Sequence, residues 1–268
     1  MVRLGYLFRP LRPIYEAIER RICLKAFPHF APIGKFHPND VFIVGYPKSG
    51  NTWMQNLVAG VVYGIDPQYA PDTLIQELVP DVHYKRYYKR FRTPMFFKSH
   101  HLPRPEYKRV VYLLRDGRDV MVSYYYYLTA VKNKEIDFLN LVKHGPDHPF
   151  GKWHEHVEAW LSNPYNVEMI VIKYENLIND PMTQLQELCE FIGIKRSTEF
   201  LEIVAKGSSF DKMRWKEKTY GSDNLAWPRD KPFVRRGKVG TYKDEMPKNV
   251  LMTFLKEAGA TLSKCGYA

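Results

Sequence analysis

The segment that most constrains this chain is a short apolar run followed by a glycine-containing turn and a helical pattern. Residues 41–44 are rich in β-branched side chains and are bounded by Gly45 and Pro47, which is typical of a buried parallel strand. Residues 51–63 place apolar side chains at helical spacing. A strand, a glycine turn and a helix N-terminus together direct backbone N–H groups at a phosphate. The sequence therefore predicts a phosphate-binding loop in an α/β fold.

The turn differs from the nucleotide-binding pattern G-x-x-x-x-G-K-[ST] at one position. Gly45 and Gly50 have the required separation and Thr52 fits the last position, but Asn51 stands where the lysine belongs. The lysine is at position 48, inside the turn. An ATPase or GTPase needs its lysine after the second glycine to reach the β- and γ-phosphates. We therefore expect a different phosphate ligand, and a P-loop kinase or NTPase is the alternative enzyme. A simple tight turn would not need these polar residues together.

A second candidate anion site follows another predicted strand, residues 110–114. Arg115 comes directly after this strand, and Ser123 lies about two turns into the helix predicted next. Ligands of open α/β sheets bind at the carboxyl ends of the strands, so both side chains can reach one anion there. The alternative for Arg115 is a surface ion pair with Asp116 or Asp119.

A pair of histidines follows the strand predicted over residues 95–99, in the segment Lys98-Ser-His-His-Leu-Pro. A single histidine in a loop is usually structural or solvated. Two consecutive histidines at a strand end, near a phosphate-binding loop, favour a catalytic role for one of them.

The loop sequence Tyr-Pro-Lys-Ser-Gly-Asn-Thr-Trp, residues 46–53, closely resembles the loop with which cytosolic-type sulfotransferases hold the 5′ end of 3′-phosphoadenosine 5′-phosphosulfate (PAPS). The family usually has threonine where this chain has Asn51, and an asparagine still donates to an anionic oxygen. The resemblance implies that Lys48 contacts the bridging oxygen of the donor and that Trp53 stacks on the adenine. Core packing is the alternative for Trp53.

The same resemblance covers the second anion-site candidate and the histidine pair. The family carries an Arg-…-Ser pair that binds the 3′-phosphate, matched by Arg115 and Ser123, and a Lys-Thr-His-Leu-Pro segment that contains the catalytic base. This chain has one extra residue there, so the base is His100 when aligned from Lys98 and His101 when aligned from Leu-Pro. We prefer His100, because Lys98 and the strand end fix its position. Lys98 is then expected to position the acceptor and the histidine.

Three further segments resemble the family. Tyr174, in the segment Lys-Tyr-Glu-Asn at 173–176, is implied to lie beside the adenine, and the segment Ser-Ser-Phe-Asp-Lys-Met at 208–213 is implied to contact the adenosine. The segment Arg-Arg-Gly at 235–237 is implied to chelate a phosphate, and a solvated basic turn is the alternative for it. The implied donor-binding residues are Lys48, Ser49, Gly50, Asn51, Thr52, Trp53, Arg115, Ser123, Tyr174, Ser208, Ser209, Phe210, Arg235, Arg236 and Gly237. The implied catalytic residues are His100, Lys48 and Lys98.

The resemblance extends over residues 36–262 and implies a P-loop-like three-layer α/β fold, with a central mainly parallel sheet flanked by helices. We expect a single domain over residues 36–268 that follows a basic segment, residues 1–35. The implied reaction moves a sulfuryl group from PAPS to a hydroxyl or amine of a small-molecule, lipid or sugar acceptor, without a metal. The family's dimer motif is not evident, so the oligomeric state stays open.

The net charge of +11 suggests an anionic ligand, a membrane surface or nucleic acid. Basic and aromatic residues alternate over 83–92, within a region, 66–93, that we expect to be irregular. This run is interpretable as a lid over an acceptor pocket, a solvated face or a nucleic-acid surface. We do not expect nucleic acid, because no recognised nucleic-acid fold accompanies the run. A basic lipid- or nucleic-acid-binding module is the non-catalytic alternative.

The N-terminal segment and the cysteines bear on location. Residues 13–26 predict a helix with a narrow apolar face, which favours docking on the domain over lying on anionic lipid. The chain has three scattered cysteines without a C-x-x-C pair, no apolar run of membrane-spanning length and no signal-peptide core. We therefore expect a cytoplasmic protein, with peripheral membrane contact through the basic N-terminus as the second interpretation.

Overall fold

A computed structural model describes residues 30–133, 135–221, 227–228 and 230–267. The helix predicted over residues 13–26 lies outside the described residues. None of the helices in the described part of the chain combines the length and hydropathy needed to cross a membrane.

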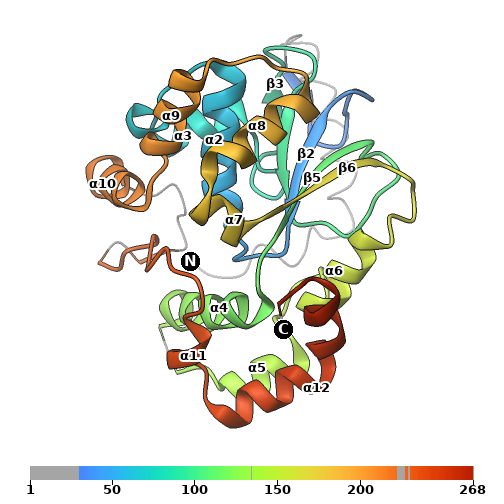
Figure 1. Ribbon diagram of the computed structural model, residues 1–268, viewed down its shortest axis with the longest axis vertical. Helices are drawn as coiled ribbons and strands as arrows, with labels where there is room; N and C mark the ends of the chain where they lie inside the picture. Colours follow the sequence, from blue (N-terminus) through green and yellow to red (C-terminus); the bar gives the residue numbers. More distant parts are fainter. Residues whose placement is uncertain (1–29, 134, 222–226, 229, 268) are drawn as a thin grey trace, which may run out of the picture.

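The core of the molecule is a four-stranded, fully parallel sheet, and a separate two-stranded antiparallel pair lies beside it (Figure 1). The strand order is β4-β2-β5-β6, so β2 is central. The sheet strands are β2 (Val41–Gly45), β4 (Phe96–Ser99), β5 (Arg109–Leu114) and β6 (Glu168–Lys173). The antiparallel pair is β1 (Phe30–Pro32) with β3 (Tyr87–Lys89). The predicted parallel sheet is confirmed.

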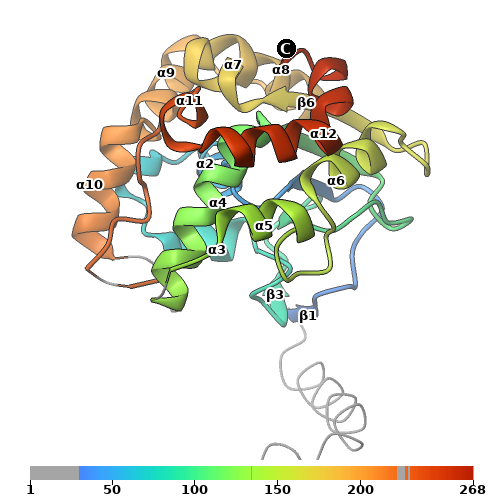
Figure 2. The ribbon, with the colours of Figure 1, turned by 90° about the horizontal axis from the view of Figure 1, so that it is seen from below.

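Helices cover both faces of the sheet, which makes three layers (Figures 1 and 2). Because successive strand side chains point to opposite faces, Val41 and Ile43 enter one buried cluster while Phe42 and Val44 enter the other. The helices that pack into the first cluster are α2 (Asn51–Tyr63), α3 (Asp72–Leu78), α8 (Pro181–Ile192) and α9 (Thr198–Gly207). Those that pack into the second are α4 (Gly117–Lys132), α5 (Phe138–His144), α6 (Trp153–Leu161) and α12 (Lys248–Lys264).

The region predicted to be irregular, residues 66–93, is ordered into short elements, and that prediction was wrong. It contains the 3₁₀ helix η2 (Pro67–Tyr69), α3 and β3. Elements this short show no repeating apolar period, so tertiary contacts decide them. The buried side chain of Ile75, for example, fixes α3 in the core. The short helices α7 (Tyr174–Asn179), α10 (Phe210–Tyr220) and α11 (Tyr242–Glu245) were also not predicted.

Part of the basic and aromatic run 83–92 is built into the domain. The Arg90 guanidinium makes a two-pronged contact with the fully buried carboxylate of Asp40, at 2.9 and 2.7 Å. The buried Tyr88 hydroxyl donates to the Lys35 carbonyl at 2.7 Å. These side chains therefore anchor β3 and the chain that precedes β2, rather than forming a free basic surface.

Candidate active site

The predicted phosphate loop joins β2 to α2 and is closed by its own hydrogen bonds. The Asn51 side-chain amide donates to the Tyr46 carbonyl at 3.0 Å, and the Ser49 backbone N–H donates to the same carbonyl at 3.1 Å. Asn51 is the departure from the family threonine, and here its amide braces the turn. The other side-chain atom, Oδ1 of Asn51, is buried without a hydrogen-bond partner among the described residues.

Glycine is required at position 50 for two reasons. Its φ of 99° is left-handed, and a Cβ there would lie 2.7 Å from the ring of Tyr174. Lys48 also has a positive φ, 75°, although it is not a glycine. A non-glycine residue in this region is held by its surroundings and is characteristic of functional loops.

The Lys48 ammonium lies between two aromatic rings. Its Nζ is 4.4 Å from the ring centroid of Tyr127 and 4.7 Å from that of Phe233, within the range of a cation–π contact. Burial, with three neighbouring positive charges, lowers the pKa of Lys48 to about 7. The three charges belong to Arg115, Lys98 and Arg235. The site therefore concentrates positive charge around one lysine that gives up its proton near neutral pH.

The residues predicted to contact the adenine meet beside this loop. The Trp53 indole donates to the Ser208 carbonyl at 2.7 Å and packs edge-on against Tyr174, with ring centroids 5.4 Å apart. The Arg115 guanidinium lies 4.1 Å from the centroid of the same tyrosine ring. Two buried polar atoms, Arg115 Nε and Ser208 Oγ, have no hydrogen-bond partner among the described residues. Buried polar groups are normally paired, so both are suited to a polar ligand.

Arg115 contacts the phosphate loop, and Ser123 lies on the helix that follows Arg115. Arg115 follows β5 and donates to the Lys48 carbonyl at 3.0 Å. The surface ion pair with Asp116 or Asp119 does not form among the described residues: Asp116 pairs with Arg118 at 2.7 Å. Ser123 is half-buried on α4, one turn before Tyr127, and residues one turn apart share a helix face.

The C-terminal glycine segment reaches the same region. Gly237 has a φ of 59°, and a Cβ there would lie 2.3 Å from the Phe210 ring, which directly follows Ser209, the N-cap of α10. The Arg235 and Arg236 guanidinium groups each lie 2.6 Å from the Glu245 carboxylate. Both predicted phosphate-binding arginines therefore hold a buried carboxylate in this structure, and nothing in the sequence pattern pointed to it.

Asp119 fixes the end of this segment. Its buried carboxylate accepts from the backbone N–H of Gly240 at 2.7 Å and of Tyr242 at 2.9 Å. It also accepts from the Thr241 hydroxyl at 3.1 Å. The C-terminal segment is thus attached to the start of α4, directly after Arg115.

The two histidines of the Lys98-Ser-His-His segment have different surroundings. His100 Nδ1 lies 2.7 Å from the Gly45 carbonyl oxygen, at the start of the phosphate loop. His101 Nδ1 lies 3.0 Å from the Tyr107 hydroxyl and 3.2 Å from Ser99 Oγ, on the strand that carries it. Only His100 is therefore joined to the loop.

Both rings are neutral near pH 7. Burial is the main cause that lowers the pKa of His100 to about 3, and the charge of Lys98 adds to it. Burial also lowers the pKa of His101 to about 4. Since a carbonyl oxygen only accepts, His100 Nδ1 carries the proton and Nε2 carries the free lone pair.

Lys98 completes the predicted catalytic set. Its ammonium is buried, with 6% of the residue exposed. Nζ lies 3.4 Å from the Thr52 hydroxyl at the start of α2 and 3.0 Å from the Asp81 carboxylate. Asp81 was not among the predicted site residues, because its position before a short turn carries no motif.

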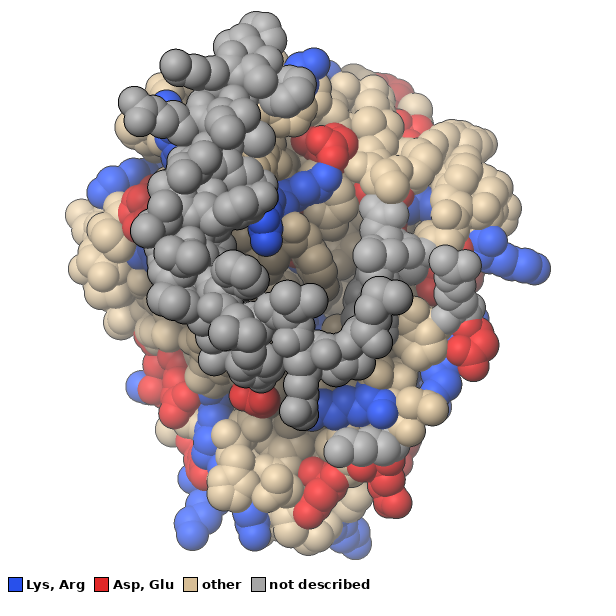
Figure 3. Space-filling model, turned by 180° about the vertical axis from the view of Figure 1, so that it is seen from behind, with Lys and Arg blue, Asp and Glu red and all other residues tan. Residues whose placement is uncertain are grey.

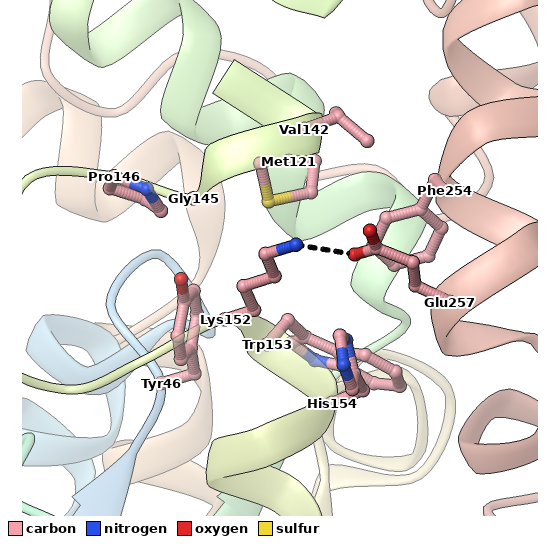
Figure 4. A pocket seen from close by; sticks show the side chains of 10 residues that line it. All are labelled: Tyr46, Met121, Val142, Gly145, Pro146, Lys152, Trp153, His154, Phe254 and Glu257. Atoms are coloured by element: carbon pink, nitrogen blue, oxygen red, sulfur yellow. Dashed lines mark hydrogen bonds and ion pairs between the residues drawn. The ribbon is translucent and has the colours of Figure 1, made fainter. Parts of the chain in front are cut away.

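A small pocket and a partly basic face are two features of the surface. Figure 4 shows a pocket among α4, α5, α6 and α12 in which Lys152 reaches across to Glu257, at 2.6 Å, and none of the predicted site residues lines it. Figure 3 shows a face on which basic side chains lie in and beside a hollow, with acidic side chains interspersed. Among the described residues, no cluster of His, Cys, Asp and Glu has the arrangement of a metal site.

A family profile described as "Sulfotransferase domain" matches residues 38–266. The chain belongs to the sulfotransferase family. This sulfotransferase is 29% identical over 230 residues to Sulfotransferase 1E1 of Bos taurus, covering 77% of this chain and 78% of the relative. It is 30% identical over 221 residues to the 3-beta-hydroxysteroid sulfotransferase of Cavia porcellus, covering 76% and 77%. The predicted family and PAPS-dependent enzyme class are confirmed.

Solved structures agree on the fold of this sulfotransferase. A retinol dehydratase in complex with androsterone and the inactive cofactor PAP has a TM-score of 0.64 at 20% identity, covering 85% of this chain and 81% of that one. The mouse sulfotransferase SULT7A1 complexed with PAP has a TM-score of 0.62 at 21% identity, covering 85% and 86%. At these identities the two solved structures show that this sulfotransferase shares their fold.

Proposed function

We propose that this sulfotransferase transfers the sulfuryl group of PAPS to a hydroxyl group of a small, largely apolar molecule, with His100 as general base. The observation that carries the proposal is the hydrogen bond of 2.7 Å between His100 Nδ1 and the Gly45 carbonyl. This bond connects the candidate base to the carbonyl at which the donor loop begins.

The polar groups around the phosphate loop support binding of PAPS. The loop residues 48–52 hold the 5′ end, Trp53 and Tyr174 face the adenine, and Arg115 with Ser123 binds the 3′-phosphate. The unpaired buried atoms Arg115 Nε and Ser208 Oγ fit a polar nucleotide there. When bound, PAPS supplies an activated sulfuryl group attached to a phosphate.

His100 acts on the acceptor. Its Nε2 lone pair takes the proton of the acceptor hydroxyl as the new O–S bond forms. The Gly45 carbonyl holds the proton of Nδ1 and fixes the ring in this tautomer. The low pKa of His100 keeps the ring unprotonated in the free enzyme, so the lone pair is available throughout the physiological pH range.

Lys48 and Lys98 act on the charge that develops during transfer. Lys48 Nζ neutralises the oxygen on which negative charge builds as the bond to sulfur breaks, and Thr52 with the loop N–H groups assists it. Negative charge next to Lys48 raises its pKa above the value of about 7 in the free enzyme, so the lysine is charged when the donor is present. Lys98, which contacts the Thr52 hydroxyl, positions the acceptor and the histidine relative to the donor loop.

Aromatic rings favour an apolar acceptor. The ring of His83 lies 5.4 Å from that of His100 and 5.1 Å from that of Phe150, measured between centroids. The ring of His148 lies 4.8 Å from Phe150. Relatives are named for hydroxysteroids, and the solved retinol dehydratases carry androsterone or retinol. We therefore place steroids and other hydroxylated lipids first among the acceptors, ahead of sugars and amines.

The test is an acceptor screen with PAPS labelled in its sulfur. Wild-type enzyme is incubated with separate pools of hydroxysteroids, phenols, long-chain alcohols, sugars and amines, and labelled product is measured. We expect label in at least one hydroxyl pool and none with Lys48→Met. Transfer to amines alone would overturn the acceptor assignment. We also expect this protein to be cytoplasmic, with any membrane contact made through residues 1–35.

A further inference from the structure

We propose that Asp81 is a positioning residue for this reaction: it holds Lys98 at the donor loop and, through His83, orients the segment that carries His100. The proposal rests on the proposed function for the role of His100, but its link to Lys98 does not. No spacing or motif in the sequence singles out Asp81.

The first link is a buried ion pair. The residues on either side of Asp81 run along β4: the Lys98 N–H donates to the Pro80 carbonyl at 2.9 Å, and the Val82 N–H donates to the Lys98 carbonyl at 3.0 Å. This pairing sets the fully buried carboxylate 3.0 Å from Lys98 Nζ. A buried ammonium needs a paired negative charge. Asp81 therefore makes it possible for Lys98 to remain charged and buried beside Thr52.

The second link runs to the histidine. The Asp81 carboxylate accepts from the His83 N–H at 2.8 Å through its other oxygen. His83 Nε2 in turn accepts from the His100 N–H at 2.9 Å, and the two rings lie nearly parallel, 19° apart. The Asp81 carboxylate thus contacts Lys98 directly, and it contacts the backbone of His83, whose ring accepts the His100 N–H.

Asp81 is ionised in this position. Burial alone would raise the pKa of Asp81, but the Lys98 ammonium and the His83 N–H favour the charged form and lower the pKa below its usual value. Conversely, the negative charge of Asp81 opposes the effect of burial on the pKa of His100 and keeps that ring more basic. The carboxylate therefore acts on both the position of the lysine and the basicity of the histidine.

The chain offers a matched control, Asp40. This aspartate is also fully buried, and its carboxylate pairs with Arg90 at 2.7 Å. It accepts backbone N–H groups from His37 and Met95, both at 2.8 Å. None of these partners belongs to the predicted site, so Asp40→Asn reports the cost of neutralising a buried, paired carboxylate without a catalytic link.

The experiment compares Asp81→Asn, Asp40→Asn, Lys98→Met and the double variant Asp81→Asn/Lys98→Met. It measures kcat and KM with PAPS and the acceptor of highest turnover, PAP affinity by calorimetry, and the melting temperature. Both asparagine variants should melt below wild type. Asp81→Asn should lower kcat roughly a hundredfold, which is the loss typical of a displaced active-site group. Its affinity for PAP should stay within about threefold of the wild-type value. Asp40→Asn should leave kcat nearly unchanged.

The double variant tests the route of the effect. If Asp81 acts through Lys98, adding Asp81→Asn to Lys98→Met should change kcat by much less than its effect in the wild type. Equal effects in both backgrounds would overturn the link to Lys98, and a kcat for Asp81→Asn like that of Asp40→Asn would overturn the proposal. Should Asp81→Asn fail to fold, His83→Phe keeps the ring but removes the acceptor for the His100 N–H, and an unchanged kcat would count against the second link.

Failure of this inference is distinguishable from failure of the proposed function. A fully active His100→Ala variant would remove the base assignment, while the coupling between Asp81 and Lys98 would still be measurable. A kcat for Asp81→Asn like that of Asp40→Asn, together with an inactive His100→Ala, would leave the base in place and remove the role of Asp81.

Discussion

The side chain of His100 donates from Nδ1 to the carbonyl oxygen of Gly45 across 2.7 Å. This contact connects the ends of β4 and β2, which are neighbours in the sheet, at the point where the phosphate loop begins. It fixes one tautomer and leaves Nε2 as the acceptor. The donor loop and the candidate base are therefore positioned by adjacent parallel strands.

Donor affinity should depend on pH through Lys48. Its pKa is about 7 in the free enzyme, and bound phosphate raises that pKa because it favours the charged form. Below pH 7 the lysine is already protonated, so PAP affinity should be flat with respect to this group. Above pH 7 binding must take up a proton, so affinity should fall by up to about tenfold per pH unit until the pKa of the complex is reached. Calorimetry with PAP from pH 7 to 9 measures this.

The matched control is Lys48→Arg, which stays charged over the whole range. Its PAP affinity should vary little between pH 7 and 9, whatever its absolute value. A slope as steep as that of the wild type would assign the titration to another group. The histidines next to the loop are not candidates, since the pKa values of His83, His100 and His101 are all lowered from the ordinary value.

Arg115 should provide selectivity for the 3′-phosphate. A charge-assisted hydrogen bond contributes about 1.5–3 kcal/mol, so Arg115→Ala should weaken PAP binding roughly ten- to a hundredfold. AMP, which lacks the 3′-phosphate, should lose much less. Calorimetry with both nucleotides on wild type and variant decides the matter. An equal loss for both would mean that Arg115 supports the loop through its bond to the Lys48 carbonyl.

Gly237 should be needed for its contact with Phe210 as well as for its backbone conformation. A Cβ at Gly237 would lie 2.3 Å from that ring, whereas a Cβ at Gly240, which also has a positive φ of 76°, would meet nothing within 4 Å. Both alanine variants carry backbone strain of about 1–2 kcal/mol. Only Gly237→Ala should also displace the segment and weaken PAP binding by roughly tenfold or more. Equal PAP affinities for the two variants would show that the contact with Phe210 does not matter.

The parts of the fold that could be predicted are those specified by local pattern. The strand–loop–helix unit over residues 41–63 follows from its apolar periodicity and its glycines, and the structure has β2 and α2 there. The strands that end at Ser99 and Leu114 were predicted for the same reason. Arg115 could be placed at the sheet edge because it directly follows a strand.

The parts that could not be predicted depend on contacts between distant residues. Asp81 and Lys98 are brought together by one bridge beside β4, and Glu245 reaches Arg235 and Arg236 through the turn that leads into α11. Lys48 receives its aromatic neighbours from α4 and from the C-terminal segment. No spacing in the sequence encodes such pairs, so the electrostatics of the site emerge only with the fold.

The assignment of His100 as the base is tested most directly by comparing turnover for His100→Ala and His101→Ala, with labelled PAPS and the best hydroxyl acceptor. PAP affinity is measured on the same samples to show that the donor site is intact. We predict that His100→Ala lowers kcat on the order of 10²–10⁴-fold with PAP affinity close to wild type, and that His101→Ala retains most of its turnover. An active His100→Ala beside an inactive His101→Ala would contradict the assignment of the base to the histidine that contacts Gly45.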